Sequence, residues 1–109
     1  MTSARAKGSQ TEIRAQKALE AEGWMVYRVP LSRAWTKSVD IFHLWDLFAV
    51  RKGEYKLVQI KTNKKPSLTP YEQFWQENMA SCLSCEVWVW YNRNSKVKSW
   101  KGWRKIIIR

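Results

Sequence analysis

Residues 46–61 read Asp-Leu-Phe-Ala-Val-Arg-Lys-Gly-Glu-Tyr-Lys-Leu-Val-Gln-Ile-Lys, and this stretch decides the fold. It contains two runs of apolar and β-branched residues, 46–50 and 55–61, which flank a short turn with a glycine. This pattern is typical of a β-hairpin. The sequence therefore predicts two paired strands, the second of which ends in Gln59 and Lys61.

Side chains alternate between the two faces of the second strand. One face carries Tyr55, Leu57, Gln59 and Lys61, and the other carries Lys56, Val58 and Ile60. Gln59 and Lys61 are therefore expected to emerge together at the end of the strand. The first strand opens with Asp46, and its pairing through the hairpin is expected to bring Asp46 close to Gln59.

Two helices are predicted around the hairpin. The first spans residues 10–22, because Ser9-Gln10-Thr11-Glu12 has the spacing of a capping box and Gly23 supplies a stop. The second spans residues 70–83, because Thr69-Pro70-Tyr71-Glu72 combines an N-cap, an early proline and a glutamate. Its apolar stripe consists of Tyr71, Phe74, Trp75, Asn78, Met79 and Cys82.

Further strands are predicted from runs of aromatic and β-branched residues. These runs are 24–29, which ends at Pro30, then 86–91, 96–100 and 105–108, the last of which could equally be helical. Residues 86–91 are apolar on both faces, as in a strand covered on two sides. A turn is expected at 92–95, and the polar stretch 31–38 is a candidate mobile loop.

The coarse order is therefore helix, strand, strand, strand, helix, strand. A chain of 109 residues suffices for one domain, so residues 1–109 are expected to form a single α/β domain. With 45% hydrophobic and 27% charged residues, the composition is that of a folded globular domain. Separate cofactor and substrate modules are excluded.

The charge of the chain points to a polyanionic partner. Twenty Lys and Arg against 9 Asp and Glu leave a net charge of +11, far more than solubility requires. The last 23 residues hold seven cations and no acid. Together with the 8 Trp, this balance favours nucleic acid as the partner.

Neither a membrane nor cysteine chemistry is expected. No apolar run approaches the roughly 18 residues that a membrane span needs, and residues 1–9 lack the apolar stretch of a signal peptide. We expect a cytoplasmic, intracellular protein, of cellular, viral or mobile-element origin. Cys82 and Cys85 form one C-x-x-C without a second ligand pair, so buried or idle thiols are favoured over a metal or a disulfide.

The tryptophans divide into two groups. Trp24, Trp75, Trp88 and Trp90 sit on periodic elements and are expected in the core. Trp35, Trp45, Trp100 and Trp103 are less explained. Trp35, and Trp100 with Trp103 among the C-terminal cations, could stack on unpaired bases or bury a dimer contact, and the sequence does not choose between these uses.

The constellation that could carry chemistry consists of Glu12 on the first helix, Asp46 on the second strand, and Gln59 and Lys61 on the third. Each has a plain alternative: Glu12 completes a capping box, Asp46 terminates a strand, and the pair at the end of the third strand forms a solvent-facing edge. Asp40 is a rival for Asp46, which is preferred because it opens an apolar strand paired with Gln59.

These residues resemble the PD-(D/E)XK nuclease superfamily, and within it the archaeal-type Holliday junction resolvases. The resemblance covers about residues 7–83 and implies a restriction-endonuclease-like αβββαβ core, with a mixed central sheet flanked by helices. Glu12 is similar to the helical glutamate of the resolvase-like branch, Asp46 to the strand aspartate, and Gln59 with Lys61 to the two ends of the (D/E)-x-K signature. Gln59 departs from the usual acid and removes one negative charge from the metal site.

The resemblance implies a site for Mg²⁺ or Mn²⁺, which prefer hard oxygen ligands. Asp46, the amide oxygen of Gln59 and the main-chain carbonyl of Ile60 could supply these ligands, and Glu12 could bind the metal or its water. Lys61 could orient the nucleophile or stabilise charge on the phosphate. The DNA-binding residues expected from charge and resemblance are Lys7, Arg28, Ser32, Arg33, Lys64 and Lys65.

Together, the residues and the resemblance predict a metal-dependent DNA endonuclease of DNA recombination and repair. The branched DNA substrate and the homodimer rest on the resemblance alone. Candidates for the dimer interface are Trp100, Trp103, Ile106, Ile107 and Ile108, with core packing as the competing use. The alternative function is a non-catalytic DNA-binding protein that keeps the nuclease fold, and an RNA-binding module is less favoured because no RRM or KH signature is visible.

Overall fold

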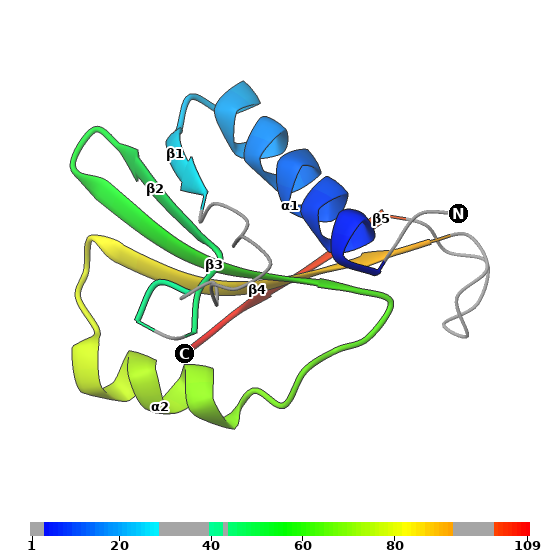
Figure 1. Cartoon of the computed structure of the whole chain (residues 1–109). Coiled ribbons are helices and arrows are strands. Elements are labelled where there is room, and N and C mark those ends of the chain that lie inside the picture. The colour runs from blue at the N-terminus through cyan, green and yellow to red at the C-terminus, as the bar shows by residue number, and fades with distance from the viewer. Residues whose placement is uncertain (1–3, 29–39, 43, 93–101) are drawn as a thin grey trace.

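The computed structural model of the chain describes residues 4–28, 40–42, 44–92 and 102–109, with side chains from residue 10 onward. Its elements, in chain order, are α1 (Ala4–Ala21), β1 (Met25–Arg28), β2 (Leu47–Arg51), β3 (Glu54–Thr62), α2 (Thr69–Asn78), β4 (Leu83–Tyr91) and β5 (Gly102–Ile107). The predicted αβββαβ order is confirmed, and a further strand follows it (Figure 1). Outside the described residues lie the predicted loop 31–38, the predicted strand 96–100 and nearly all of the predicted turn 92–95.

The five strands form one mixed sheet in the order β1-β2-β3-β4-β5. Strands β1, β2 and β3 are antiparallel neighbours, β3 and β4 run parallel, and β5 is antiparallel to β4. The parallel pair is joined through α2, as parallel strands require a crossover connection. In the predicted hairpin, Leu47 lies opposite Val58 and Arg51 lies opposite Glu54.

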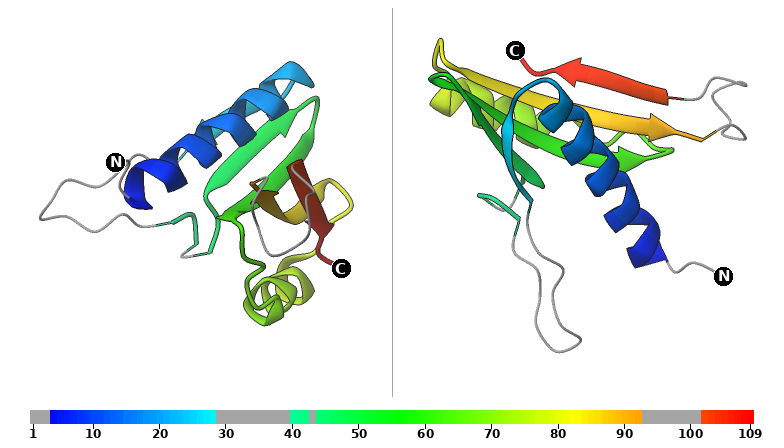
Figure 2. Two further views of the ribbon diagram at one scale, coloured as in Figure 1. Left: turned by 90° about the vertical axis from the view of Figure 1, so that its right-hand side faces the viewer. Right: turned by 90° about the horizontal axis from the view of Figure 1, so that it is seen from above.

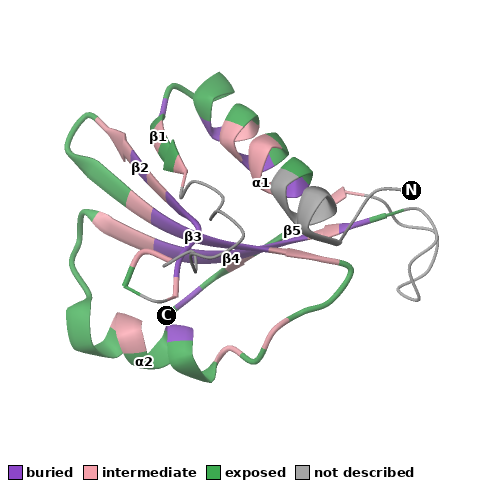
Figure 3. Cartoon of the chain, in the orientation of Figure 1, coloured by how far each residue is buried: buried purple, intermediate pink, exposed green. Residues whose placement is uncertain are grey.

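The two helices cover opposite faces of the sheet, each over its own apolar cluster (Figures 1 and 3). The cluster on the α1 side contains Ala15, Leu19, Trp24, Leu47, Ala49, Val58, Ile60 and Trp88. The cluster on the α2 side contains Trp45, Leu57, Tyr71, Cys85, Val87, Val89, Tyr91 and Ile108. The predicted α/β class, with a mixed sheet flanked by helices, is therefore confirmed, as is the burial of the β4 stretch on both faces.

Helix α1 begins at Ala4, earlier than the predicted residue 10, so the capping-box interpretation of residues 9–12 is wrong. Residues 4–7 are Ala-Arg-Ala-Lys, all strong helix formers, and their propensity extends the helix through Gly8 despite a cost of about 1 kcal/mol for a glycine. The Thr11 hydroxyl accepts a 2.9 Å hydrogen bond from Thr62 Oγ1, which ties α1 to β3. The predicted stop is confirmed: Gly23 has φ +91° and its N–H donates to the Glu20 carbonyl.

Helix α2 ends at Asn78, earlier than the predicted residue 83, and residue 83 instead begins β4. The backbone of Met79 is extended (φ −57°, ψ 141°), and the Asn78 side-chain amide donates to the Phe74 carbonyl, which satisfies a group at the helix end. The predicted cap at Thr69 is also wrong, because Leu68 occupies the N-cap position and no side chain caps the helix. Met79 and Cys82 are exposed and do not belong to the helical stripe.

The C-terminal residues 102–107 form a strand, which resolves the ambiguity for 105–108. Ile108 is buried, and Ile106 packs against the α2-side cluster. Trp103 packs against the α1-side cluster. Core packing therefore accounts for these three candidates for a dimer interface, whereas Ile107 is 52% exposed and Trp100 lies outside the described residues.

Of the four tryptophans expected in the core, Trp24, Trp75 and Trp88 lie there, whereas Trp90 belongs to neither apolar cluster of the described residues. Trp24 and Trp88 are buried, Trp75 packs against the α2-side cluster, and Trp90 is half-buried. Trp45, which the sequence left unexplained, is fully buried and packs edge-on against α2. Both cysteines are free thiols. No helix in the described ranges is long and apolar enough to cross a membrane.

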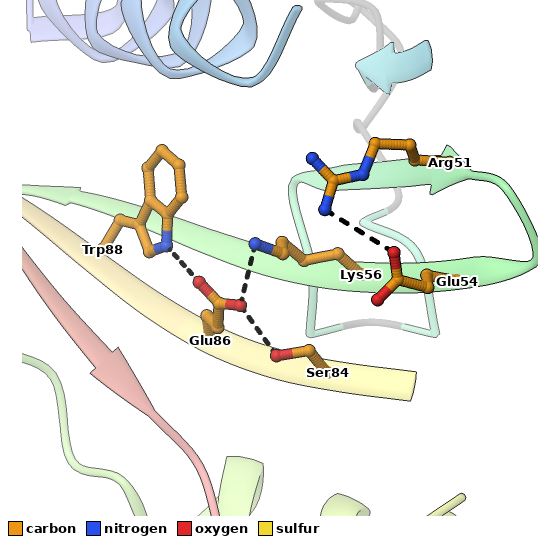
Figure 4. A network of polar contacts seen from close by, with 6 residues as sticks. All are labelled: Arg51, Glu54, Lys56, Ser84, Glu86 and Trp88. Carbon is orange, nitrogen blue, oxygen red and sulfur yellow. Dashed lines mark hydrogen bonds and ion pairs between the residues drawn. The ribbon is translucent and has the colours of Figure 1, made fainter. Parts of the chain in front are cut away.

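A buried polar network joins β3 to β4 (Figure 4). The Glu86 carboxylate is 5% exposed and pairs with Lys56 Nζ at 3.1 Å. It also accepts hydrogen bonds from Ser84 Oγ at 2.7 Å and Trp88 Nε1 at 2.8 Å. Because a cation and two donors balance its charge, this acid is explained by the packing of the sheet.

Candidate active site

The hairpin holds Asp46 against β3 by two hydrogen bonds. The Asp46 N–H donates to the Val58 carbonyl at 2.9 Å, and Asp46 Oδ2 accepts the Ile60 N–H at 3.0 Å. Asp46 directly precedes β2, and its side chain bonds to the backbone of the strand that carries Gln59 and Lys61. The predicted approach of Asp46 to the end of β3 is thus present.

The environment of Asp46 disfavours its negative charge. The residue is 8% exposed, and its pKa is raised from 3.8 to about 7, first because burial removes water from the carboxylate. The nearby charges of Glu12 and Asp40 raise the pKa further, while the Ile60 N–H and the charge of Lys61 lower it. Glu86 has a lysine in direct contact, whereas no ion pair between Asp46 and a described cation is present within 4.0 Å.

Gln59 is buried beside Asp46. Its side-chain amide is satisfied when the NH₂ group donates to Asp46 Oδ2 at 3.2 Å and to the Leu44 carbonyl at 2.6 Å. A metal ligand would have to be the amide oxygen, so coordination by Gln59 requires the amide to turn over. The Gln59 amide thus contacts the Asp46 carboxylate through its NH₂ group, which does not bind metals, and not through its oxygen.

Glu12 faces the same region from α1. Its side chain is 22% exposed, and its Oε1 lies 4.0 Å from Arg28 Nη1 at the end of β1. The pKa of Glu12 is raised, mainly by burial and also by Asp40, while Arg28 lowers it. Arg28 Nη1 is itself buried and makes no hydrogen bond to any described residue. Arg28, predicted as a DNA contact, therefore serves here as a long-range partner of Glu12.

Two residues that sequence reasoning did not assign to the site also belong to this region. Asp40, considered only as a rival of Asp46, acts electrostatically on both Asp46 and Glu12. Tyr71 on α2 has a raised pKa because of burial and of the charges of Asp46 and Asp40, and its ring packs 5.2 Å from the ring of Trp45. A tyrosine in the apolar stripe of a helix carries no sequence signal for such a position.

Basic side chains gather where β3 ends. Lys61, Lys64 and Lys65 line an open hollow of about 480 Å³, together with residues 62, 66 and 67. Lys61 is half-buried, whereas Lys64 and Lys65 are exposed. The two predicted DNA contacts in this loop are therefore brought next to the predicted catalytic lysine. Of the remaining predicted contacts, Lys7 lies in α1 without a described side chain, and Ser32 and Arg33 lie outside the described residues.

A hard divalent cation requires several oxygen ligands close together. Within the described ranges, no three His, Cys, Asp or Glu side chains come close enough to form a metal centre by themselves. A site here would therefore combine the Asp46 carboxylate with neutral oxygens, namely the Gln59 amide and the Ile60 carbonyl. Such oxygen ligands are chemically suited to Mg²⁺ or Mn²⁺.

The family of the chain is identified by a family model and not by a curated relative. No curated protein matches the chain. The family model described as archaeal Holliday junction resolvase (hjc) matches residues 3–71, a span that contains α1, the hairpin and every residue of the candidate active site. This family has a PD-(D/E)XK nuclease-like fold, in agreement with the mixed sheet and its two flanking helices. The chain belongs to the archaeal Holliday junction resolvase family.

Proposed function

We propose that this protein is a divalent-metal-dependent endonuclease that cleaves branched DNA, Holliday junctions in particular. The observation that carries the proposal is the buried Asp46 carboxylate, whose pKa is raised to about 7. It is held against the Gln59–Lys61 segment in a chain of the resolvase family. A structural acid would be expected to have its charge balanced, as Glu86 has.

In this proposal, Asp46, Gln59 and the Ile60 carbonyl hold Mg²⁺ or Mn²⁺, and Glu12 binds the metal or its water. The bound ion supplies Lewis acidity toward the phosphate and lowers the pKa of a water molecule. Lys61, half-buried beside Asp46, orients the nucleophile or stabilises negative charge on the phosphate. Coordination through Gln59 includes the turn of its amide, which releases one hydrogen bond to Asp46.

The DNA backbone is proposed to lie along the hollow lined by Lys61, Lys64 and Lys65. Lys7, Arg28, Ser32 and Arg33 are proposed as further contacts. The net charge of +11 supports strong attraction to phosphates, and DNA affinity should therefore fall steeply as salt increases.

A homodimer is part of the proposal, because symmetric cleavage of a four-way junction needs two sites related by a two-fold axis. Of the C-terminal isoleucines, Ile108 is buried and Ile106 packs in the core, so only Ile107 is exposed for such an interface. Sedimentation with and without a junction tests this point, and a monomer under both conditions at micromolar concentration would contradict it.

The direct test is a cleavage panel of labelled junction, flap, duplex and single strand, with and without Mg²⁺. We expect Mg²⁺-dependent cleavage of the junction, and a loss of at least about a hundredfold in Asp46→Asn and in Lys61→Ala. Both variants should still bind the junction, because phosphate contacts rather than the metal hold the backbone. Lys52→Ala is the matched control, since this exposed lysine lies in the β2–β3 turn at the opposite end of the hairpin.

One observation favours a second candidate function. The Gln59 NH₂ group donates to Asp46, an arrangement that satisfies both side chains without a metal. A DNA-binding protein that keeps the nuclease fold without catalysis is therefore the alternative. Junction binding without cleavage of any substrate in the panel, in Mg²⁺ and in Mn²⁺, would establish this alternative and refute the nuclease.

A further inference from the structure

Strands β4 and β5 carry an aromatic surface on the α1 side of the sheet. Helix α1 packs against β1, β2 and β3, and the view from above shows that β4 and β5 extend beyond it (Figure 2). In the β4–β5 register, Trp90 lies opposite Trp103 and Trp88 lies opposite Lys105, so these side chains share one face. We call Trp88, Trp90, Trp103, Arg14 and Lys105 the tryptophan ledge.

The rings of the tryptophan ledge pack edge-on against one another. The centroids of Trp90 and Trp103 lie 5.0 Å apart at 71°, and those of Trp88 and Trp103 lie 5.4 Å apart at 61°. Trp88 is 1% exposed and anchors the cluster, whereas Trp90 and Trp103 are only half-buried. The Trp90 indole is fixed further by a 3.0 Å hydrogen bond from Nε1 to Asn92 Oδ1. Trp90 and Trp103 therefore present aromatic area whose orientation is already set.

Two cations are stacked on these rings. The guanidinium carbon of Arg14 lies 4.1 Å from the Trp90 ring centroid, and Lys105 Nζ lies 4.1 Å from the Trp88 ring centroid. Both residues are exposed. The acid on the same face, Glu86, is buried and paired with Lys56. The accessible part of the ledge thus combines aromatic and guanidinium planes with positive charge.

We propose that the tryptophan ledge binds an unpaired nucleic-acid strand by stacking bases on Trp90, Trp103 and the guanidinium plane of Arg14. Aromatic and guanidinium planes stack on bases of any sequence, and adjacent cations neutralise the phosphates. A base pair within a duplex has both faces already stacked on its neighbours, so only an unpaired strand can use the ledge. This inference rests on the DNA-binding part of the proposed function and not on its metal chemistry.

The position of the ledge relates it to the candidate active site. Trp90 lies opposite Thr62 in the β3–β4 register, and Thr62 directly follows Lys61. Lys61 and the ledge are therefore at the same end of the sheet, with Lys61 on the α2-side face and Trp90 on the α1-side face. A strand that is unpaired at a branch point could extend from the lysine hollow over this end of the sheet onto the ledge.

A second copy of the chain is a less suitable occupant. A two-fold interface built on this face would bring Arg14 and Lys105 of each copy toward the same cations of the other. Within the part of the chain that the structure describes, no acid forms an ion pair with Arg14 or Lys105, and their positive charge instead matches a polyanion.

The test measures the affinity for a fluorescein-labelled oligothymidine and for a duplex of equal length, by anisotropy in EDTA so that no cleavage occurs. Trp90→Leu should weaken single-strand binding roughly tenfold, as expected for the loss of one stacked base, and should leave duplex binding unchanged. Trp90→Phe, which keeps an aromatic plane, should retain most of the affinity. Lys52→Gln, which changes an exposed cation in the β2–β3 turn, is the matched charge control.

The variant Arg14→Gln/Lys105→Gln changes exposed side chains only, so it tests the ledge even if Trp90→Leu fails to fold. We expect a loss of single-strand affinity of about tenfold, greater than that of Lys52→Gln. The proposal is overturned if this double variant and folded Trp90→Leu bind oligothymidine like the parent, if Trp90→Phe loses as much as Trp90→Leu, or if the ledge variants instead dissociate a dimer. Failure of junction cleavage with intact single-strand binding would refute the nuclease and not the ledge.

Discussion

Asp46→Asn should make the folded protein more stable at neutral pH, although it removes a carboxylate proposed to be essential for DNA cleavage. In the unfolded chain an aspartate ionises near its ordinary pKa of 3.8, whereas in the folded protein Asp46 ionises at about 7. Between these two pH values the folded state binds more protons than the unfolded state, so the stability contributed by this group falls as pH rises. The cost is absent below about pH 4 and complete above about pH 7.

The magnitude follows from the pKa difference. A shift of about three units corresponds to about 4 kcal/mol of unfolding free energy at pH 8, since each unit is worth 1.36 kcal/mol. An asparagine cannot ionise, and its side-chain oxygen can still accept the Ile60 N–H. After an allowance for a weaker hydrogen bond, we expect Asp46→Asn to gain roughly 2–4 kcal/mol at pH 8 and less than about 1 kcal/mol at pH 4.5.

Urea denaturation of parent and variant at pH 4.5, 6 and 8 measures this difference in EDTA. The control is Glu77→Gln, which removes an equal charge from an exposed position on α2 and should change the unfolding free energy by less than about 0.5 kcal/mol. Addition of Mg²⁺ at pH 8 should stabilise the parent and not Asp46→Asn, because the ion binds only the folded parent. An Asp46→Asn variant that is no more stable than the parent at pH 8, or equally stabilised at pH 4.5, would refute the reasoning.

Three further predictions concern other parts of the molecule. Lys56→Met should destabilise the protein by about 3–5 kcal/mol, because it leaves the Glu86 carboxylate buried without its cation. In urea denaturation, the double variant Lys56→Met/Glu86→Gln should recover most of this loss. A cost of under about 1 kcal/mol in Lys56→Met alone would contradict the role of the pair. Gln59→Glu should destabilise the protein by about 1–2 kcal/mol at pH 8 in EDTA, because it places a second carboxylate against the buried acid. The same variant should lower the Mg²⁺ concentration needed for cleavage. Unchanged stability together with an unchanged Mg²⁺ requirement would remove Gln59 from the site. Burial, and secondarily the charge of Glu86, raises the pKa of the Cys85 thiol to about 11. An alkylating reagent at pH 8 should therefore modify the exposed Cys82 at least about a hundredfold faster than the buried Cys85. Equal modification rates of the two cysteines, measured by mass spectrometry, would contradict this.

The part of the fold that could be predicted from the sequence depends on local periodicity. The hairpin and the two faces of β3 follow from alternation within a short stretch, and the structure confirms both, with Leu57 in the α2-side cluster and Val58 in the α1-side cluster. The approach of Asp46 to Gln59 follows from the same pairing. Such features need no knowledge of distant residues, which is why the sequence predicts them correctly.

The helix ends were less predictable because local signals compete. The spacing of residues 9–12 fits a capping box, yet the strong helix formers before it extend α1 to Ala4. In α2 the apolar spacing continues through Met79 and Cys82, although the extended backbone at Met79 has already ended the helix. A repeat of apolar positions records which residues would share a helical face, but not where the backbone leaves the helix.

The details of the site depend on tertiary placement and have no sequence signature. The direction of the Gln59 amide is set by Asp46 and the Leu44 carbonyl, and the electrostatic involvement of Tyr71 is set by the packing of α2 under the sheet. The C-terminal isoleucines could serve a core or an interface equally well until the β4–β5 register is known. These features become predictable only once the elements are packed against one another.

The central claim is that Asp46, Gln59 and the Ile60 carbonyl hold a divalent cation, and paramagnetic Mn²⁺ tests it most directly. In amide NMR spectra of the ¹⁵N-labelled protein, substoichiometric Mn²⁺ should broaden the signals of Asp46, Ile60 and Lys61 first. The signal of Gly53, at the other end of the hairpin, should stay sharp, and Asp46→Asn should abolish the selective effect. Absence of broadening, or broadening that does not distinguish Ile60 from Gly53, would contradict the metal site.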